Sequence, residues 1–355
     1  MKKPVLKFIL TKYFVLIFVI GTTLTIPFRQ QIELPQPYPL EYPVSFGNNY
    51  VVPASNPTTE PGVKLGRMLF YETRLSANST VSCASCHKQE YAFADNRRQS
   101  LGHDGSLTTR NAMALVNLLW VKQFFWDGRV KGLEEQATFP LTDPHEMGQA
   151  LEESVKKLKQ TAEYPALFQA AFGTDVTAKG IVQALAQFER TLISASSRYD
   201  RFLSGQYLLD PSEKRGMDLF KTANCAHCHG GPKMYKELFH NNGFDISSID
   251  PGRSAFTGRQ EDKGRFRVAT LRNIALTSPY MHDGRFATLR DVLDHYSDHI
   301  QPSETLSPFL TDDAGNIRLL RLTSQEKTDI IAFLRLLTDS TFVTNPLFSD
   351  PFNLN

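Results

Sequence analysis

Four cysteines fall into two short motifs whose residue types and spacing suit a redox cofactor. The sequence reads CASCH at 83–87 and CAHCHGG at 225–231, so a histidine directly follows each Cys-x-x-Cys pair. This is the attachment motif of c-type haem, in which both thiols bond to the porphyrin and the imidazole binds the iron on its proximal side. We predict two covalently bound haem c groups, held by Cys83, Cys86 and His87 and by Cys225, Cys228 and His229.

Four cysteines could also form two disulfides, redox-active Cys-x-x-Cys pairs or zinc sites. A disulfide framework would not need a histidine after each pair. Haem attachment is favoured because the same histidine follows both pairs and no cysteine is left over.

The two motifs lie in segments that resemble each other. The first motif ends the segment GRMLFYETRLSANSTVSCASCH, and the second ends the segment GMDLFKTANCAHCH. Downstream, DGR at 127–129 matches DGR at 283–285, and we pair Arg110-Asn111 with Arg272-Asn273. The chain is therefore expected to hold two copies of one haem-binding unit.

Helical patterns dominate the elements that must position these motifs. In TSQEKTDIIAFLRLLTD, Thr323 and Glu326 have the spacing of a capping box, and apolar residues follow at helical intervals. Residues 150–173 and 178–194 also have helical patterns, and no long stretch alternates with a period of two. We predict an all-α fold with two cytochrome c-like haem domains in tandem. The expected parts are a signal peptide or N-terminal anchor at 1–28, a Pro-rich arm at 29–49, haem domains at 50–205 and 206–345, and a tail at 346–355.

The two copies differ at one position that could bind iron. Counting from the DGR triplets sets Trp126 opposite His282 and Pro140 opposite Tyr296. Proline cannot bind iron, whereas tyrosine can. If this position faces the distal side of each haem, the first haem is open to a small oxidant and the second is closed by Tyr296. The alternative is a helix that turns away from both haems, with Tyr296 a half-buried aromatic residue.

These motifs resemble those of the bacterial di-haem cytochrome c peroxidase family, which includes the MauG-type enzymes. The resemblance runs from about residue 55 to residue 340. It rests on the two CxxCH boxes, FWDGR, LEEQA with PLTDPHEM, RNIALTSPYMHDGRFATLRDVL and IIAFLRLLT. It implies an enzyme that reacts with hydrogen peroxide at the first haem, in the domain 50–205, and uses the second domain for electron transfer.

The resemblance also implies roles for four residues of the first copy. Glu146 matches a distal carboxylate that moves a proton between the two oxygens of peroxide, which is general acid-base catalysis. Gln136 matches a second polar residue of that pocket, and Trp126 matches a tryptophan that relays electrons between the haems. His103 matches a loop histidine that caps the first haem at rest in many members and swings away on activation. A solvated loop carboxylate, a core tryptophan and a surface histidine are the alternatives.

Other matched residues concern a metal ion and the haem carboxylates. Asn111, Thr277 and Pro279 match positions that hold a calcium ion between the domains, and oxygen ligands suit this cation. Arg110 and Arg272 are expected to pair with haem propionates.

Tyr296 departs from most peroxidases of the family, which carry methionine there, and agrees with the MauG-type enzymes. A thioether ligand favours ferrous iron, whereas an anionic phenolate favours ferric iron and lowers the haem potential. Met281 directly precedes His282 in the family motif and is not expected to reach the iron. His295 and His299, on either side of Tyr296, are expected to face solvent.

The charge balance limits the kinds of partner, and the N-terminal sequence indicates the location. Lys+Arg 39 balance Asp+Glu 37 without a long run of one sign, so we predict no nucleic-acid partner. Basic residues at 2, 3, 7 and 12 precede an apolar run over about 13–28, the layout of an export signal or an uncleaved anchor. We expect a periplasmic protein, with or without a tether to the inner membrane.

These observations give one main prediction and two alternatives. The main prediction is an exported di-haem peroxidase that reduces hydrogen peroxide to water at the first haem. Its electrons would come through the second haem from a small cytochrome c or cupredoxin. The first alternative is a MauG-type enzyme that uses peroxide to oxidise a partner protein through a haem ligated by His229 and Tyr296. The second is a non-catalytic di-haem electron carrier or redox sensor, against which Pro140 and Glu146 argue. A homodimer is compatible with the sequence.

Overall fold

The computed structural model describes residue 1, residues 35–246 and residues 248–353. Residues 35–246 and 248–353 belong to one compact unit. The predicted export signal or anchor at 1–28 therefore lies outside the described residues, except for Met1. Within the described ranges, none of the helices combines the length and the apolar character that a membrane crossing requires.

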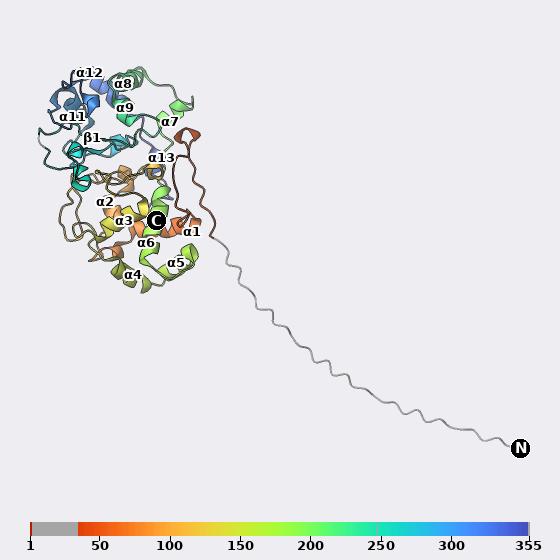
Figure 1. Cartoon of the computed structure of the whole chain (residues 1–355). Helices are drawn as coiled ribbons and strands as arrows, with labels where there is room; N and C mark the ends of the chain where they lie inside the picture. Colours follow the sequence, from red (N-terminus) through yellow and green to blue (C-terminus); the bar gives the residue numbers. More distant parts are fainter. Residues whose placement is uncertain (2–34, 247, 354–355) are drawn as a thin grey trace. The chain divides into compact units, whose positions relative to one another are not determined.

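Residues 35–246 and 248–353 fold into short helices joined by irregular segments (Figure 1). Two strands of two residues each, β1 (Phe239–His240) and β2 (Phe266–Arg267), pair antiparallel. The prediction of a mostly helical fold is confirmed, and this strand pair is a small departure from an all-α architecture. The α-helices in the described part are α1 (Glu60–Tyr71), α2 (Cys83–Cys86), α3 (Leu133–Thr142), α4 (Leu151–Lys159), α5 (Tyr164–Phe172), α6 (Ala178–Arg190), α7 (Arg198–Leu203), α8 (Pro211–Thr222), α9 (Cys225–His229), α10 (Ser254–Thr257), α11 (Leu289–Asp294), α12 (Ser324–Arg335) and α13 (Ser340–Val343).

Two predicted helices can be compared with the structure in detail. The capping box is confirmed at the start of α12: the Glu326 backbone donates to the Thr323 hydroxyl, and the Thr323 backbone donates to the Glu326 carboxylate. The predicted helix over 150–173 is instead two helices, α4 and α5. Pro165 lies in the first turn of α5, where its missing N–H group is tolerated, and it could not continue α4 without losing a helical hydrogen bond.

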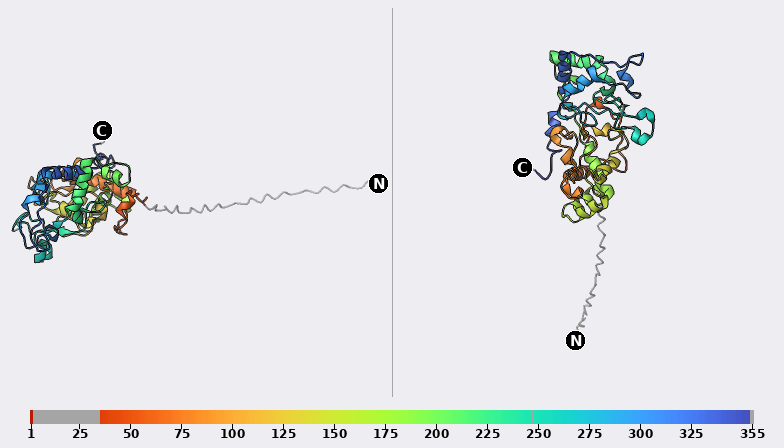
Figure 2. Two further views of the ribbon diagram at one scale, coloured as in Figure 1. Left: turned by 90° about the horizontal axis from the view of Figure 1, so that it is seen from above. Right: turned by 90° about the vertical axis from the view of Figure 1, so that its left-hand side faces the viewer.

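Two helix pairs form equivalent frames in the two halves of the chain. Helix α1 packs on α6, and helix α8 packs on α12 (Figures 1 and 2). A Cβ atom added at Gly66 would lie 1.9 Å from the carbonyl oxygen of Ala184, and one at Gly216 would lie 1.8 Å from that of Asp329. Since only glycine allows such an approach of two backbones, each frame depends on its glycine.

Each frame carries its own apolar core. Phe70 meets Phe188 across the first frame, with ring centroids 5.3 Å apart, and Phe220 meets Phe333 across the second at 5.2 Å. The first core extends over residues 63–192 and the second over residues 217–337. In each half, one helix of the pair precedes the CxxCH box in the sequence and the other follows it, and the apolar core forms around this pair.

The C-terminal end of the chain returns to the first core. Phe342 and Phe348 pack on Phe93, with ring centroids 5.6 and 6.4 Å apart. The Tyr71 hydroxyl donates to the carbonyl of Phe348 at 2.7 Å. Residues 342–348 therefore pack with the first half of the repeat, although 206–345 was expected to be the second domain.

Two asparagines in left-handed conformation correct the alignment of the copies. Asn117 has φ 58° and Asn273 has φ 61°, and each precedes a one-turn 3-10 helix. Their backbone N–H groups donate to equivalent carbonyls, Leu192 after α6 and Leu337 after α12, both at 2.9 Å. Asn273 therefore corresponds to Asn117, and its pairing with Asn111 was wrong.

The Pro-rich arm lies along the surface of the unit over its described residues 35–49. The indole nitrogen of Trp120 donates to Gly47 O at 2.8 Å, and the Lys233 ammonium donates to Phe46 O at 2.5 Å. Phe46 itself is buried against Trp120. This part of the arm is packed on both halves of the repeat.

Candidate active site

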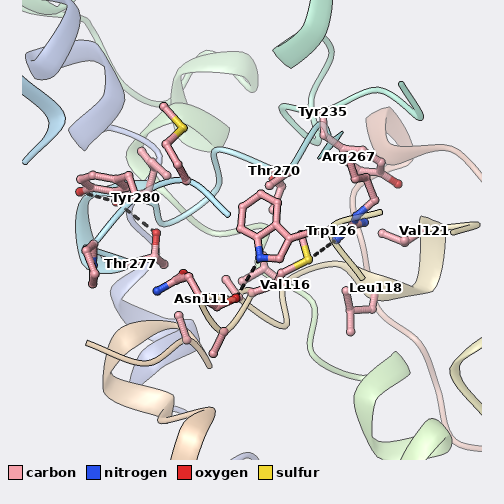
Figure 3. A pocket seen from close by; sticks show the side chains of 18 residues that line it. Asn111, Val116, Leu118, Val121, Trp126, Tyr235, Arg267, Thr270, Thr277 and Tyr280 are labelled. Atoms are coloured by element: carbon pink, nitrogen blue, oxygen red, sulfur yellow. Dashed lines mark hydrogen bonds between the residues drawn. The ribbon is translucent and has the colours of Figure 1, made fainter. Parts of the chain in front are cut away.

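Three adjoining cavities contain most of the residues that the sequence singled out. The first cavity is lined by the first CxxCH box and has about 1360 Å³ of free space, its open mouth included. The second cavity is lined by the second box and has about 1470 Å³. A smaller central cavity is shown in Figure 3. Trp126 and Arg267 line all three.

Both box histidines are oriented in the same way. The Nδ1 atom of His87 lies 2.8 Å from the carbonyl oxygen of Phe93, and that of His229 lies 3.1 Å from that of Ala269. A carbonyl can only accept, so Nδ1 carries the proton and Nε2 keeps a lone pair, as an iron ligand must. Burial lowers the pKa of both imidazoles, that of His229 to about 4, which keeps them neutral.

The structure bears on two of the other uses of the cysteines, disulfides and zinc sites. All four are free thiols, so the two disulfides considered above are not formed. Within residues 35–246 and 248–353, no group of three His, Cys, Asp or Glu side chains could hold a metal ion, so a zinc site of this kind is not supported either. Burial raises the pKa of all four thiols.

Helix α3 and the loop after it bring three predicted residues to the first cavity. Gln136 and Pro140 are one turn apart on α3, so both face the same side, and Glu146 follows in the loop. Burial raises the pKa of Glu146 to about 7, with a further increase from Asp143 and an opposing effect of Arg129. A carboxyl group with this pKa can both accept and return a proton near neutral pH.

Tyr296 lines the second cavity together with Cys225, Cys228 and His229. It lies in a short π-helix, His295–His299, that continues α11. Its hydroxyl accepts a hydrogen bond of 2.7 Å from the side-chain nitrogen of Asn242. Burial raises the phenol pKa, and the bond from Asn242 opposes this effect.

Both histidines beside Tyr296 were expected to face solvent, and only one of them does. His299 is exposed. His295 is only 4% exposed, and its Nε2 lies 3.0 Å from the carbonyl oxygen of Asn242. The wider turn of the π-helix changes the helical register, and His295 packs against Phe244 at a centroid distance of 4.6 Å.

Trp126 lines all three cavities, and Figure 3 shows it among the side chains of the central one. Its indole nitrogen donates to the carbonyl of Asn111 at 2.8 Å. Asn111, Thr277 and Pro279, the predicted calcium ligands, all line the central cavity. The side-chain nitrogen of Asn111 donates to the carbonyl oxygens of Arg97 and Arg98, so of its side-chain atoms only the oxygen could serve the predicted calcium ion.

His103 is not among the residues that line the first cavity. Its backbone N–H donates to the carbonyl of Glu146 at 2.8 Å. Its ring lies against Gly148, where an added Cβ atom would be 2.3 Å from Nε2. Binding of His103 to iron in the first cavity stays a prediction, and it would require the loop 101–107 to move.

The two arginines expected to meet haem propionates both have protein partners, and Arg110 also lines the first cavity, so its contact with a propionate stays a prediction. Arg110 binds Asp250 through two hydrogen bonds of 2.8 Å and Asp127 through one of 2.6 Å. Arg272 is fully buried and pairs with Asp200, and it lines none of the three cavities. The sequence could not identify this, because Asp200 lies far from Arg272 along the chain.

Three buried polar atoms without a hydrogen-bond partner lie at the cavity walls. They belong to Glu189 in the first cavity, to His240 in the second and to Arg267 in both. Sequence reasoning missed these residues, and also Asn242. Large apolar cavities with unpaired polar atoms at their edges fit a haem, which has an apolar macrocycle and two carboxylates.

The comparisons with known proteins agree with this class of site. A family model described as di-haem cytochrome c peroxidase matches residues 60–207. Methylamine utilization protein MauG of Methylophilus methylotrophus is 35% identical over 292 residues, which are 80% of this chain and 84% of that protein. Cytochrome c551 peroxidase of Nitrosomonas europaea is 36% identical over 294 residues, 81% and 83% of the two chains.

Solved structures give the same result. The crystal structure of a MauG-like protein associated with microbial copper homeostasis is 36% identical, has a TM-score of 0.82 and covers 89% of this chain and 99% of its own. The di-haem peroxidase BthA of Burkholderia thailandensis, at 23% identity and a TM-score of 0.70, shares the fold.

The chain belongs to the di-haem cytochrome c peroxidase family. The predicted enzyme class, an oxidoreductase that acts on peroxide, is thereby confirmed, and the family implies two haem c cofactors.

Proposed function

We propose that this protein reduces hydrogen peroxide in the first cavity and receives the electrons through the second. The observation that carries the proposal is the difference between the cavities. The first is lined by Glu146, Gln136 and Pro140, none of which is an expected iron ligand. The second contains Tyr296, whose hydroxyl is fixed by Asn242. We also propose haem domains over 50–205 and 206–345, each around one CxxCH box.

Haem bound at both boxes supplies the redox-active iron atoms. Reduction of H₂O₂ to two water molecules consumes two electrons and two protons. The Glu146 carboxylate would accept the proton of one peroxide oxygen and donate it to the other, which leaves as water. The Gln136 amide would hold the peroxide by hydrogen bonds. His87 and His229 would bind the iron through Nε2, and Trp126 would connect the two cavities.

Stopped-flow spectroscopy of the purified di-haem protein tests this function. Mixing with peroxide and a reduced small cytochrome c or cupredoxin should oxidise two donor molecules for each peroxide if the donor gives one electron. Absence of peroxide consumption with every donor would contradict the proposal and favour an electron carrier or redox sensor.

A second candidate function is oxidation of a partner protein, as in the MauG-type enzymes. Tyr296 favours it, because an anionic phenolate on the second haem would favour ferric iron. The position of His103 outside the first cavity favours it as well, since peroxide could enter without prior reduction.

Adding peroxide to the fully oxidised protein separates the two functions. A spectral change that is lost in Tyr296→Met would support the MauG-type function. Inactivity until one haem is reduced would support the gated peroxidase. The structural neighbour associated with copper homeostasis makes a copper protein a rational first partner to test.

Further parts of the proposal concern the location and calcium. A basic and then apolar N-terminus supports export to the periplasm, through a cleaved signal or as an inner-membrane anchor. We propose a calcium ion in the central cavity, bound by the Asn111 side chain and the carbonyls of Thr277 and Pro279. Metal analysis before and after chelation would test it.

A further inference from the structure

Arg267 is a buried cation without a counter-ion in the described part of the chain. It is 8% exposed, its Nε has no hydrogen-bond partner, and its Nη2 contacts the sulfur of Met113 at 3.5 Å. Glu237 is near enough to influence it, but the two form no ion pair. Burial lowers the pKa of Arg267 from its ordinary value. An uncompensated charge in the interior is costly, so this position calls for an anion.

The backbone holds Arg267 firmly at the junction of the cavities. Strand β2 pairs Arg267 with Phe239 of β1, and the Arg267 N–H donates to the carbonyl of Trp126 at 2.6 Å. Figure 3 shows Arg267 and Trp126 among the side chains of the central cavity. The side chain thus lies next to the residue proposed to connect the two haems.

The two other arginines that line the first cavity are already paired, and Arg318, which lines the second, is exposed. Arg110 is held by Asp127 and Asp250, and Arg129 is held by Asp127. The planar guanidinium of Arg267 matches the geometry of a carboxylate, with two parallel hydrogen bonds. Since Arg267 lines both box cavities, a carboxylate from either side could reach it.

We propose that Arg267 is a carboxylate-binding residue shared by the two haem sites, and that it binds a propionate of the first haem, of the second haem, or one of each. The charge then favours the reduced state of the haem that it contacts, because a nearby cation opposes the extra positive charge of ferric iron. Arg267 is a positioning residue. From strand β2 it holds a haem propionate, and through this contact it affects the redox state of that haem.

The inference rests on the proposed function, because it needs haem at both boxes. Mass spectrometry of the purified protein must first find two covalent haems. If one is missing in the unsubstituted protein, the proposed function fails. If both are present, the following measurements test the inference alone.

Spectroelectrochemical titration of both haems compares Arg267→Gln with the unsubstituted protein. At a fixed potential, the ratio of ferrous to ferric iron should fall about tenfold for the haem that supplies the carboxylate, about 59 mV for a one-electron couple. A shift of one haem identifies the source, and a shift of both indicates a bridging contact. Arg259→Gln removes an exposed cation of the same segment and should leave both haems unchanged. Unchanged potentials in Arg267→Gln would overturn the inference.

Two further variants keep the test valid if Arg267→Gln does not fold. Arg267→Lys keeps the charge and loses the planar fork, so its ratio should fall less than in Arg267→Gln, roughly two- to threefold. In Arg267→Met, a propionate would lose its partner, and the thermal midpoint of the holoprotein should fall. A midpoint above that of the unsubstituted protein would show that Arg267 has no anion partner.

Discussion

The two halves of the repeat share a frame and differ at the position that faces the cavity. In both halves a glycine brings two helices together, and a left-handed asparagine binds the carbonyl that follows the second helix. At the matched cavity position, the first half has Pro140 inside α3 and the second has Tyr296 in a π-helix. The common features concern folding, and the difference concerns the access to iron that we propose.

The difference extends to the groups around each matched position. Glu146 in the first cavity has a pKa raised to about 7 by burial. In the second cavity, Asn242 fixes the hydroxyl of Tyr296. One cavity therefore has a group suited to proton transfer, and the other has a group suited to iron binding.

The strongest test of this contrast is Glu146→Gln. Glutamine keeps the shape and cannot accept the proton, so the rate of reaction with peroxide should fall by about 100-fold or more. Stopped-flow spectroscopy would measure the rate. Glu135→Gln, which changes an exposed carboxylate of α3, should react like the unsubstituted protein. An unchanged rate in Glu146→Gln would remove the acid-base role.

The common frame can be broken in either half. Gly66→Ala or Gly216→Ala would press a Cβ atom against the backbone of the facing helix. Each should lower the free energy of unfolding by about 1–3 kcal/mol or more, because the helices must move apart. Denaturant unfolding of the holoprotein would measure it. Lys64→Ala and Lys221→Ala, at exposed positions of α1 and α8, should change it by less than about 0.5 kcal/mol. An equally small effect of the glycine variants would contradict the equivalence of the frames.

The pH dependence follows from the raised pKa of Glu146. The carboxylate form accepts the proton, so the rate of reaction with peroxide should be constant above pH 7 and fall about tenfold per pH unit below it. Stopped-flow rates between pH 5 and pH 9 (roughly two units on either side) would check it. In Glu146→Gln this dependence should disappear. A rate that is flat over this whole range would show that burial does not act as inferred.

The smallest expected effect concerns the second cavity. Asn242→Ala removes the donor to the Tyr296 oxygen, which makes the phenolate a stronger ligand for ferric iron. The ferrous to ferric ratio of the second haem should fall roughly three- to tenfold at a fixed potential, as expected for one hydrogen bond. Redox titration would measure it, with Asn316→Ala, in an exposed loop, as control. A change in the first haem alone would contradict the assignment of Tyr296 to the second.

Local signals made several features predictable. The Thr323–Glu326 capping box was found at its predicted place because it depends on four consecutive residues. The segment 150–173 was predicted to be helical from its pattern, yet Pro165 lies in the first turn of a second helix. Asn111 was paired with Asn273 by residue type alone, whereas backbone conformation selects Asn117.

The sequence by itself determined the two CxxCH boxes, the mostly helical fold and the contrast between Pro140 and Tyr296, because each depends on residue type and spacing along the chain. Only the tertiary structure decided which polar groups have partners. It paired Arg272 with Asp200, buried His295 and left Arg267 beside Trp126 without a counter-ion. Ion pairing and burial depend on side chains that are distant in sequence and become neighbours when the helices pack.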